Sequence, residues 1–211
     1  MSGEGPPEAA RSAVQRDHPS DAPTTAGIAD AVRRMHARLD TIRDELNAAD
    51  RVLGDGDTGM TVASVVDAWR AALANDYQDV GTMLRELGRE TRRATGSSLG
   101  SVMGIGLSAA GKSGATSTVA MLDAATAAIT ERSGATPGDK TILDALLAIR
   151  DALAEGRDPA DAAQGALDTF RTREAKIGRA RIYGAKSAGH DDPGMLAALL
   201  LVRAAISRED K

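Results

Sequence analysis

Three carboxylates that lie close together in the sequence are the residues best suited to bind a metal ion. Asp50, Asp55 and Asp57 fall within L-N-A-A-D-R-V-L-G-D-G-D-T-G-M, residues 46–60. The glycines among them permit a tight turn after a helix that ends at Asp50, so we expect the three side chains to meet. Like charges this close repel one another, and a bound cation neutralises them. An all-oxygen ligand set that also includes phosphate oxygens suits Mg²⁺.

Other interpretations of this loop exist. A calcium-binding EF-hand needs Gly at its sixth position and Glu at its twelfth, and counting from Asp55 gives Met60 and Val66 there, which excludes it. A solvated Asp-Gly turn between two helices remains open for Asp-Gly-Asp alone. A helix that begins near Thr58 favours the metal site, because its free N–H groups and positive dipole end would hold a phosphate beside the metal.

The composition indicates an all-helical protein with an aliphatic core. The chain has 211 residues, enough for one domain, and 42% of them are hydrophobic but only 2% aromatic. The absence of cysteine excludes disulfides and thiolate metal sites. The net charge of -4 and the scarcity of aromatic residues argue against nucleic acid as a partner. No apolar run is long enough to cross a membrane and no signal-peptide pattern is present, so we expect a cytoplasmic protein.

Apolar periodicity divides the chain into a tail and one helical domain. Residues 1–25 lack periodicity and are rich in Gly, Pro and Ser, which predicts a disordered tail before a domain over residues 26–211. The expected helices cover about residues 28–50, 58–75, 80–94, 99–110, 116–132, 139–156, 160–176 and 193–207. Asp139 is the expected N-cap of the helix over residues 139–156, and Asp192 is that of the helix over residues 193–207. About eight antiparallel helices with short connections predict an all-α barrel or bundle.

The connection over residues 176–194 is long for a compact domain, and long ordered connections usually have a function. Arg179, Arg181 and Lys186 within it are candidates for phosphate contact. A solvated basic loop is the alternative. His190, in the same connection, is expected to be a hydrogen-bonded structural residue.

A second motif predicts a different fold. Residues 106–113, G-L-S-A-A-G-K-S, match the phosphate-loop pattern G-x-x-x-x-G-K-[ST], which belongs in a nucleotide-binding α/β domain. That motif needs a strand before it and a helix that opens at the lysine, and the chain offers no set of buried strands. We therefore expect the end of a helix here, with Gly111 as its cap and Lys112 near the exposed carbonyls.

Four blocks in order resemble the nucleotide-binding L subunit (DhaL-type domain) of dihydroxyacetone kinases, which is also the C-terminal domain of the single-chain enzymes. They are L-N-A-A-D-R-V-L-G-D-G-D-T-G, T-G-S-S-L-G-S-V-M-G, P-G-D-K-T-I-L-D-A-L and G-R-A-R-I-Y-G-A-K-S-A-G-H-D-D-P-G. The resemblance implies a barrel of eight antiparallel helices with ATP or ADP at one end. It also implies that the acceptor, a short ketose, is held by a separate K subunit.

The resemblance implies roles for individual residues. Asp50, Asp55 and Asp57 would hold two Mg²⁺ ions that bridge the nucleotide phosphates, with Arg179 beside them, and these four would be the catalytic residues. Further nucleotide contacts are implied for Thr58, Gly59, Met60, Thr61, Ser97, Ser98, Ser133, Ile142, Asp192, Pro193 and Gly194.

Two departures from the family pattern affect these expectations. Thr58 stands where members that use the sugar phosphotransferase system usually have His, which favours ATP as the donor. Leu99 replaces a serine, so Ser98 is expected to make the hydroxyl contact. The sequence thus predicts a kinase subunit that is active only with its partner and monomeric on its own, and it does not identify the ketose. A nucleotide-loaded adaptor without turnover is the alternative.

Overall fold

The computed structural model describes residues 22–207, apart from the side chain of Arg179. Within that range the chain forms nine α-helices and one 3-10 helix and contains no strand, so the predicted all-α class is confirmed. The elements are α1 (Thr25–Ala37), α2 (Leu39–Leu53), α3 (Thr58–Ala72), α4 (Val80–Ala94), α5 (Ser98–Lys112), α6 (Thr118–Ser133), α7 (Ile142–Ala154), α8 (Pro159–Arg171), η1 (Arg179–Ser187) and α9 (Pro193–Ile206). Most of the predicted tail, residues 1–21, lies outside the described residues.

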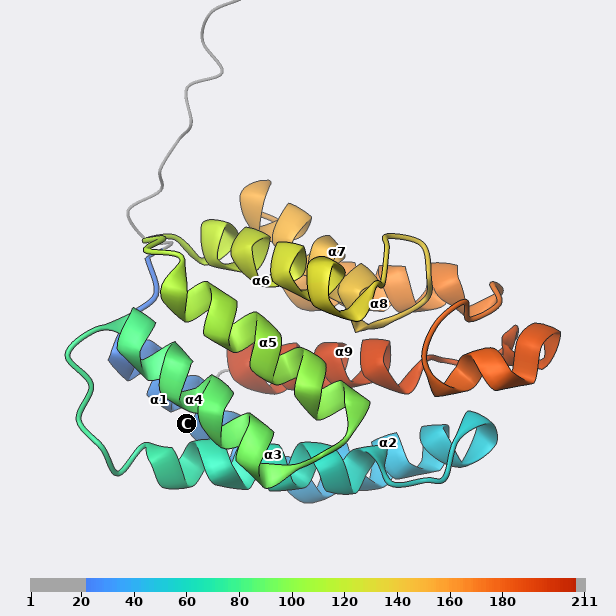
Figure 1. Cartoon of the computed structure of the whole chain (residues 1–211), viewed down its shortest axis with the longest axis horizontal. Helices are drawn as coiled ribbons and strands as arrows, with labels where there is room; N and C mark the ends of the chain where they lie inside the picture. The colour runs from blue at the N-terminus through green and yellow to red at the C-terminus, as the bar shows by residue number, and fades with distance from the viewer. Residues whose placement is uncertain (1–21, 208–211) are drawn as a thin grey trace, which may run out of the picture.

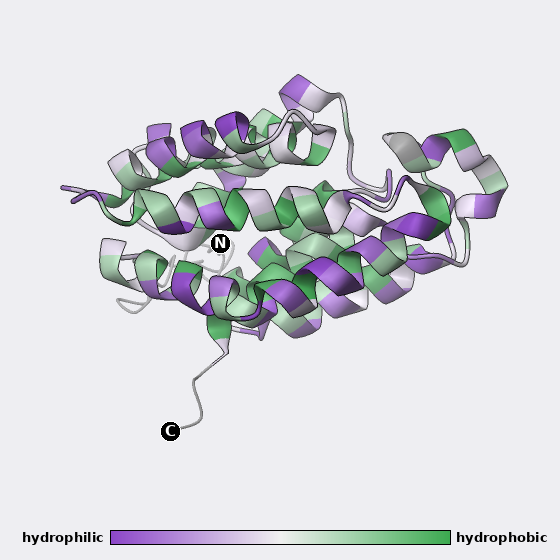
Figure 2. Cartoon of the chain, turned by 90° about the horizontal axis from the view of Figure 1, so that it is seen from below, coloured by the Kyte–Doolittle hydropathy of each residue, from purple (hydrophilic) through white to green (hydrophobic). Residues whose placement is uncertain are grey.

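Helix α9 forms the centre of the core. It crosses the middle of the molecule in Figure 1, and it contacts α1, α2, α3, α7 and α8. A helix that is apolar on every side has to be buried, and α9 fits this rule, with Met195 and Leu199 at its heart. The outward faces of the surrounding helices are largely hydrophilic, as Figure 2 shows. In the described part of the chain, no helix combines the length and apolar character needed to span a membrane.

The antiparallel pair α4 and α5 packs backbone to backbone through glycines. A Cβ on Gly88 would lie 3.0 Å from the carbonyl oxygen of Gly104, and one on Gly111 would lie 2.6 Å from that of Gly81. Residues 106–112 are helical throughout, and Gly111 lies inside α5. These residues therefore do not form a phosphate loop, and the expectation that Gly111 caps the helix is wrong as well, because α5 continues to Lys112.

Several expected boundaries differ from the structure, among them the end of the helix expected over residues 160–176, since α8 ends at Arg171. The first expected helix is divided at Arg38, whose φ of -110° and ψ of 12° interrupt it, so Asp50 lies inside the last turn of α2 and not at its end. Asp139 is not the cap of α7. Thr141 has that role, in a capping box with Asp144. The connection before α9 contains η1, where we had expected only a loop.

An apolar cavity of about 480 Å³ lies between the helices. Three apolar side chains line both this cavity and a second, smaller pocket beside the start of α9: Val102, Ile129 and Ile142. They therefore separate the interior of the barrel from its open end.

Candidate functional site

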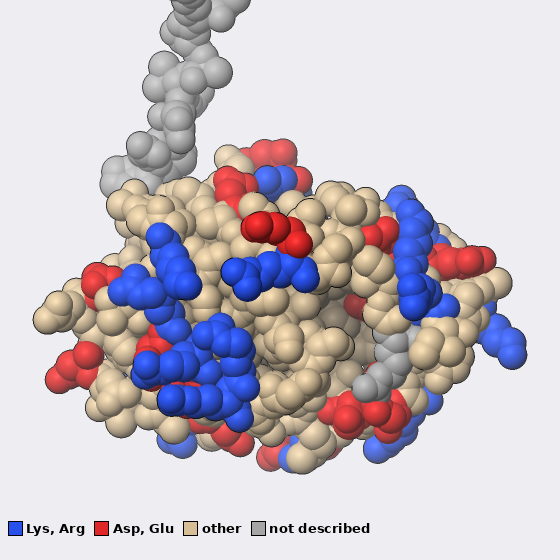
Figure 3. Space-filling view, viewed as in Figure 1, with Lys and Arg blue, Asp and Glu red and all other residues tan. Residues whose placement is uncertain are grey.

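The structure brings the three carboxylates together. Each of Asp50, Asp55 and Asp57 offers an oxygen, and these oxygens lie within 4.8 Å of one another. Asp50 is only 5% exposed, and its Oδ2 accepts hydrogen bonds from the backbone N–H groups of Asp57 (3.0 Å) and Thr58 (3.2 Å). These two bonds fold the connection between α2 and α3 back over the end of α2. In Figure 3, acidic side chains gather at the lower right of the molecule, at the end where this connection lies.

Two glycines are required for this turn. A Cβ on Gly54 would lie 2.1 Å from Oδ1 of Asp50, so any larger residue would displace the carboxylate. A Cβ on Gly59 would lie 2.0 Å from the carbonyl oxygen of Arg43, and the N–H of Gly59 donates to Oδ1 of Asn47 at 2.8 Å. Gly59 therefore packs the first turn of α3 against α2.

A pocket of about 270 Å³ opens beside the carboxylates. Most of the residues proposed from the sequence line it: Asp50, Asp57, Thr58, Thr61, Ser97, Ser98, Ser133, Ile142, Asp192, Pro193 and Gly194. Asp55, Gly59 and Met60 are not in its wall, and Met60 is 54% exposed. The backbone of Arg179 begins η1, next to Ala180 of the pocket wall, while its side chain is outside the described part.

Four helices begin at this pocket. The N-cap residues of α3, α5, α7 and α9, which are Asp57, Ser97, Thr141 and Asp192, all line it. Each helix start carries a partial positive charge and N–H groups that attract anions. One pocket therefore combines a cluster of carboxylates, which favours a cation, with four helix ends that favour an anion.

Desolvation shifts the pKa of one cap residue. Asp192 Oδ1 accepts from the N–H of Met195 at 2.8 Å. Desolvation raises the pKa of Asp192 to about 6, against the opposing effects of the Met195 and Gly194 N–H groups and of Lys140. Near neutral pH this carboxylate is ionised at a cost in stability.

Lys140 anchors the connection between α8 and α9, which forms part of the pocket wall. This side chain is 1% exposed, and its Nζ donates to the carbonyl oxygens of Arg173 and Ser187, both at 2.8 Å, and of Arg171 at 3.3 Å. Desolvation lowers the pKa of Lys140, while the nearby carboxylates of Asp192 and Asp191 raise it. The lysine ties the end of α8 and the end of η1 to the start of α7.

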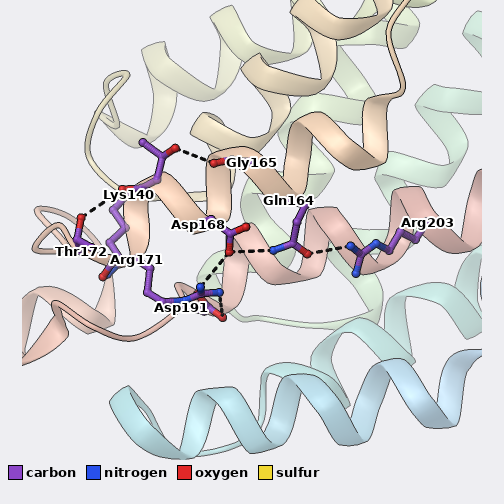
Figure 4. Close-up of polar contacts among 9 residues, drawn as sticks. Lys140, Gln164, Gly165, Asp168, Arg171, Thr172, Asp191 and Arg203 are labelled. Atoms are coloured by element: carbon purple, nitrogen blue, oxygen red, sulfur yellow. Dashed lines mark hydrogen bonds and ion pairs between the residues drawn. The ribbon is translucent and has the colours of Figure 1, made fainter.

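A polar network extends this attachment along α8, as Figure 4 shows. The guanidinium of Arg171 holds both carboxylate oxygens of Asp191, at 2.7 and 3.1 Å, and also pairs with Asp168 at 2.9 Å. Gln164 donates to Asp168 and accepts from Arg203 of α9. The residues before α9 are thus fixed to the body of the domain.

Residues 52–207 match the DAK2 domain family. The chain belongs to this family. The match begins two residues after Asp50, so it includes the other two carboxylates and every helix from α3 onward.

Curated relatives of this DAK2 domain include several kinases. The chain is 33% identical over 205 residues to the L-erythrulose 1-kinase of Mycolicibacterium smegmatis, covering 84% of this chain and 36% of that protein. It is 30% identical over 220 residues to the human triokinase/FMN cyclase, covering 92% and 38%. The dihydroxyacetone kinase of Citrobacter freundii is 33% identical over 179 residues, covering 79% and 32%. The chain therefore spans about a third of the length of these proteins.

A solved structure shares the fold of this DAK2 domain. The dihydroxyacetone kinase from C. freundii in complex with AMP-PNP and Mg²⁺ superposes with a TM-score of 0.69 at 27% identity, covering 97% of this chain and 37% of that one. Its native form gives a TM-score of 0.70 at 25% identity. The sequence matches and the shared fold both agree with the resemblance to dihydroxyacetone kinases that the sequence indicates.

Sequence reasoning missed part of the site in this DAK2 domain. The apolar half of the pocket wall was not foreseen: Leu53, Leu99, Val102, Ile129, Ala135, Ile177 and Ala180. Thr141 and Lys140 were missed too, although both lie in the block P-G-D-K-T-I-L-D-A-L. A threonine followed three residues later by Asp144 was the available signal for the cap. Arg181, Lys186 and His190 are all exposed.

Proposed function

We propose that this chain is the ATP/ADP- and Mg²⁺-binding subunit of a dihydroxyacetone-type kinase, and that it supplies the phosphoryl group to a short ketose held on a separate K subunit. One observation carries the proposal: the carboxylate cluster and four helix N-termini share a single pocket. A metal-bound polyphosphate satisfies both, because its cations neutralise the carboxylates while its anionic oxygens receive the helix N–H groups. The likeness to a kinase that carries AMP-PNP and Mg²⁺ supports it.

The residues fit Mg²⁺. All candidate ligand atoms are carboxylate oxygens, which a hard cation prefers. Asp50 is oriented by two backbone N–H groups, whereas Asp55 and Asp57 are exposed and can reach incoming ligands. We propose that the three carboxylates bind two ions, because together they offer enough oxygens for both. When bound, such ions would neutralise charge on the transferred phosphoryl group.

The chain's own groups would orient the nucleotide. We assign the phosphates to the starts of α3 and α5, where Thr58, Thr61, Ser97 and Ser98 add hydroxyl groups to the helix N–H groups. The apolar wall beside Ile142 would receive the nucleoside and exclude water from it. Arg179 would stabilise the charge that moves between donor and acceptor. We assign the ketose to another polypeptide, as the resemblance to dihydroxyacetone kinases implies.

The proposal is tested by turnover. Purified chain, a ketose-binding K subunit from the same organism, dihydroxyacetone and Mg²⁺-ATP should together yield phosphorylated ketose, and omission of either protein should abolish the product. A chain that binds Mg²⁺-ATP and K subunit but never forms product would be an adaptor. That outcome contradicts a kinase role.

A further inference from the structure

Exposed apolar side chains are concentrated at one end of the molecule. Among the described residues, the large hydrophobic side chains with the greatest exposure are Val52 (50%), Met60 (54%), Ile182 (80%), Tyr183 (39%) and Ile206 (44%). Four of them lie on the last turn of α2, the first turn of α3 and η1, the elements that surround the carboxylates at the right-hand end in Figure 1. Isolated surface hydrophobics are ordinary, but such a concentration marks an interaction surface.

The packing of η1 makes this exposure notable, because two of its small residues, Ala180 and Ser187, are buried while its two largest apolar side chains are not. Ala180 is buried against Leu53 and Ala175, and Ser187 is fully buried. Ile182 and Tyr183 remain outside. Leaving an isoleucine in water forgoes roughly 1.5–3 kcal/mol of burial. Stability of the isolated chain therefore does not explain this arrangement, whereas a covering partner does.

The charges on η1 indicate the chemistry of that partner. Arg181 and Lys186 flank the two exposed side chains and are themselves exposed. Residues 175–190 contain no acidic residue, and no ion pair of Arg181 or Lys186 occurs in the described structure. A second copy that used this segment symmetrically would bring like charges together. A partner with carboxylates at these positions is favoured instead.

We propose that Val52, Met60, Ile182 and Tyr183 form the docking surface for the polypeptide that presents the phosphoryl acceptor, which meets them with apolar side chains and meets Arg181 and Lys186 with carboxylates. This inference rests on the proposed function. Transfer requires the reacting atoms to approach within about 3–3.5 Å, so the acceptor's carrier has to cover the opening beside the carboxylates. The rest of each relative, about two-thirds of its length, is long enough to contain such a carrier in the relative's own chain.

The test compares two serine substitutions at opposite ends of the domain. Ile182→Ser should weaken binding of the ketose-binding K subunit about tenfold in calorimetry, because buried interface anchors carry most of the binding energy. Ile206→Ser is the matched control: it removes an exposed isoleucine at the far end of α9 and should leave this affinity unchanged. Val52→Ser, on a different element, should weaken binding in the same way. Circular dichroism verifies that each variant is folded.

The outcomes separate this inference from the proposed function. Mg²⁺-ATP affinity should be the same in wild type, Ile182→Ser and Ile206→Ser. Equal loss or equal retention of K-subunit binding in Ile182→Ser and Ile206→Ser overturns the docking surface alone. Sedimentation that shows a dimer disrupted by Ile182→Ser assigns the surface to a second copy and also overturns it. A wild type that binds no Mg²⁺-ATP or no K subunit contradicts the proposed function itself.

Discussion

The buried ammonium of Lys140 donates a hydrogen bond to the carbonyl oxygen of Ser187 at 2.8 Å, across 47 positions of the chain. Both residues are almost completely buried. The bond joins the residue two positions before α7 to the end of η1, and both elements contribute residues to the pocket wall. A charged side chain thus fixes a connection that has little apolar core of its own.

Replacing this lysine should destabilise the domain. Lys140→Met keeps the stem but leaves the carbonyls of Arg173 and Ser187 without their donor, which should cost at least about 2 kcal/mol in the free energy of unfolding by urea. Lys176→Met is the control: Lys176 is largely exposed and 3.9 Å from Asp139, so its loss should cost less than about 0.5 kcal/mol. Equal stability of the two variants contradicts the assigned role of Lys140.

Local parts of the site could be predicted from the sequence, because residues near in the chain build them. Asp50, Asp55 and Asp57 are joined by a short glycine-containing turn, and the capping serine Ser97 precedes its helix directly. Lys140 could not be placed in this way, since its acceptors lie 31 to 47 positions away and only the packed fold brings them close.

The misplaced boundaries have local physical causes. Asp139 and Thr141 are both good cap residues, and Asp144 selects Thr141 by accepting its backbone N–H at 2.9 Å. Asp139 instead accepts from the N–H and hydroxyl of Thr136. The interruption at Arg38 has no glycine or proline to announce it, so periodicity continued across it.

Glycine at position 54 should be essential for metal binding. Gly54→Ala places a Cβ 2.1 Å from Oδ1 of Asp50, which should turn the carboxylate away and reduce Mg²⁺-ATP affinity at least about tenfold in calorimetry. Gly165→Ala, in α8 with open space around it, should keep this affinity and gain about 0.5–1 kcal/mol of stability. Retained affinity in Gly54→Ala would show that Asp50 is not a ligand.

Stability without ligand should depend on pH through Asp192. Its folded-state pKa of about 6 lies above the ordinary 3.8, so the folded state binds the proton more tightly and loses stability as pH rises from about 4 to 6. Asp192→Asn can still cap α9 and should be more stable than wild type at about pH 7.5, by up to about 3 kcal/mol. The gain should vanish near pH 4. Urea unfolding at both pH values measures it, and a gain of the same size at pH 4 would contradict this cause.

Nucleotide should be exchanged on every catalytic cycle. A chain that retains ADP has to be rephosphorylated in place by a phosphohistidine protein, and Thr58 offers a hydroxyl but no imidazole for that exchange. With K subunit, ketose and labelled ATP, we expect many turnovers and release of ADP into solution. If ADP stays bound and only a phosphotransferase-system protein restores turnover, the prediction of nucleotide exchange is wrong.

The central claim is that the three carboxylates hold Mg²⁺ and through it the nucleotide. Calorimetric titration of Mg²⁺-ATP into wild type, Asp55→Asn and Asp44→Asn tests it most directly. Asp44 is an exposed carboxylate on α2 that pairs with Arg43, so its amide variant controls for loss of one negative charge. We expect Asp44→Asn to bind like wild type, and Asp55→Asn to keep its helical fold but lose at least about tenfold in affinity. Unchanged affinity in Asp55→Asn would contradict the assignment.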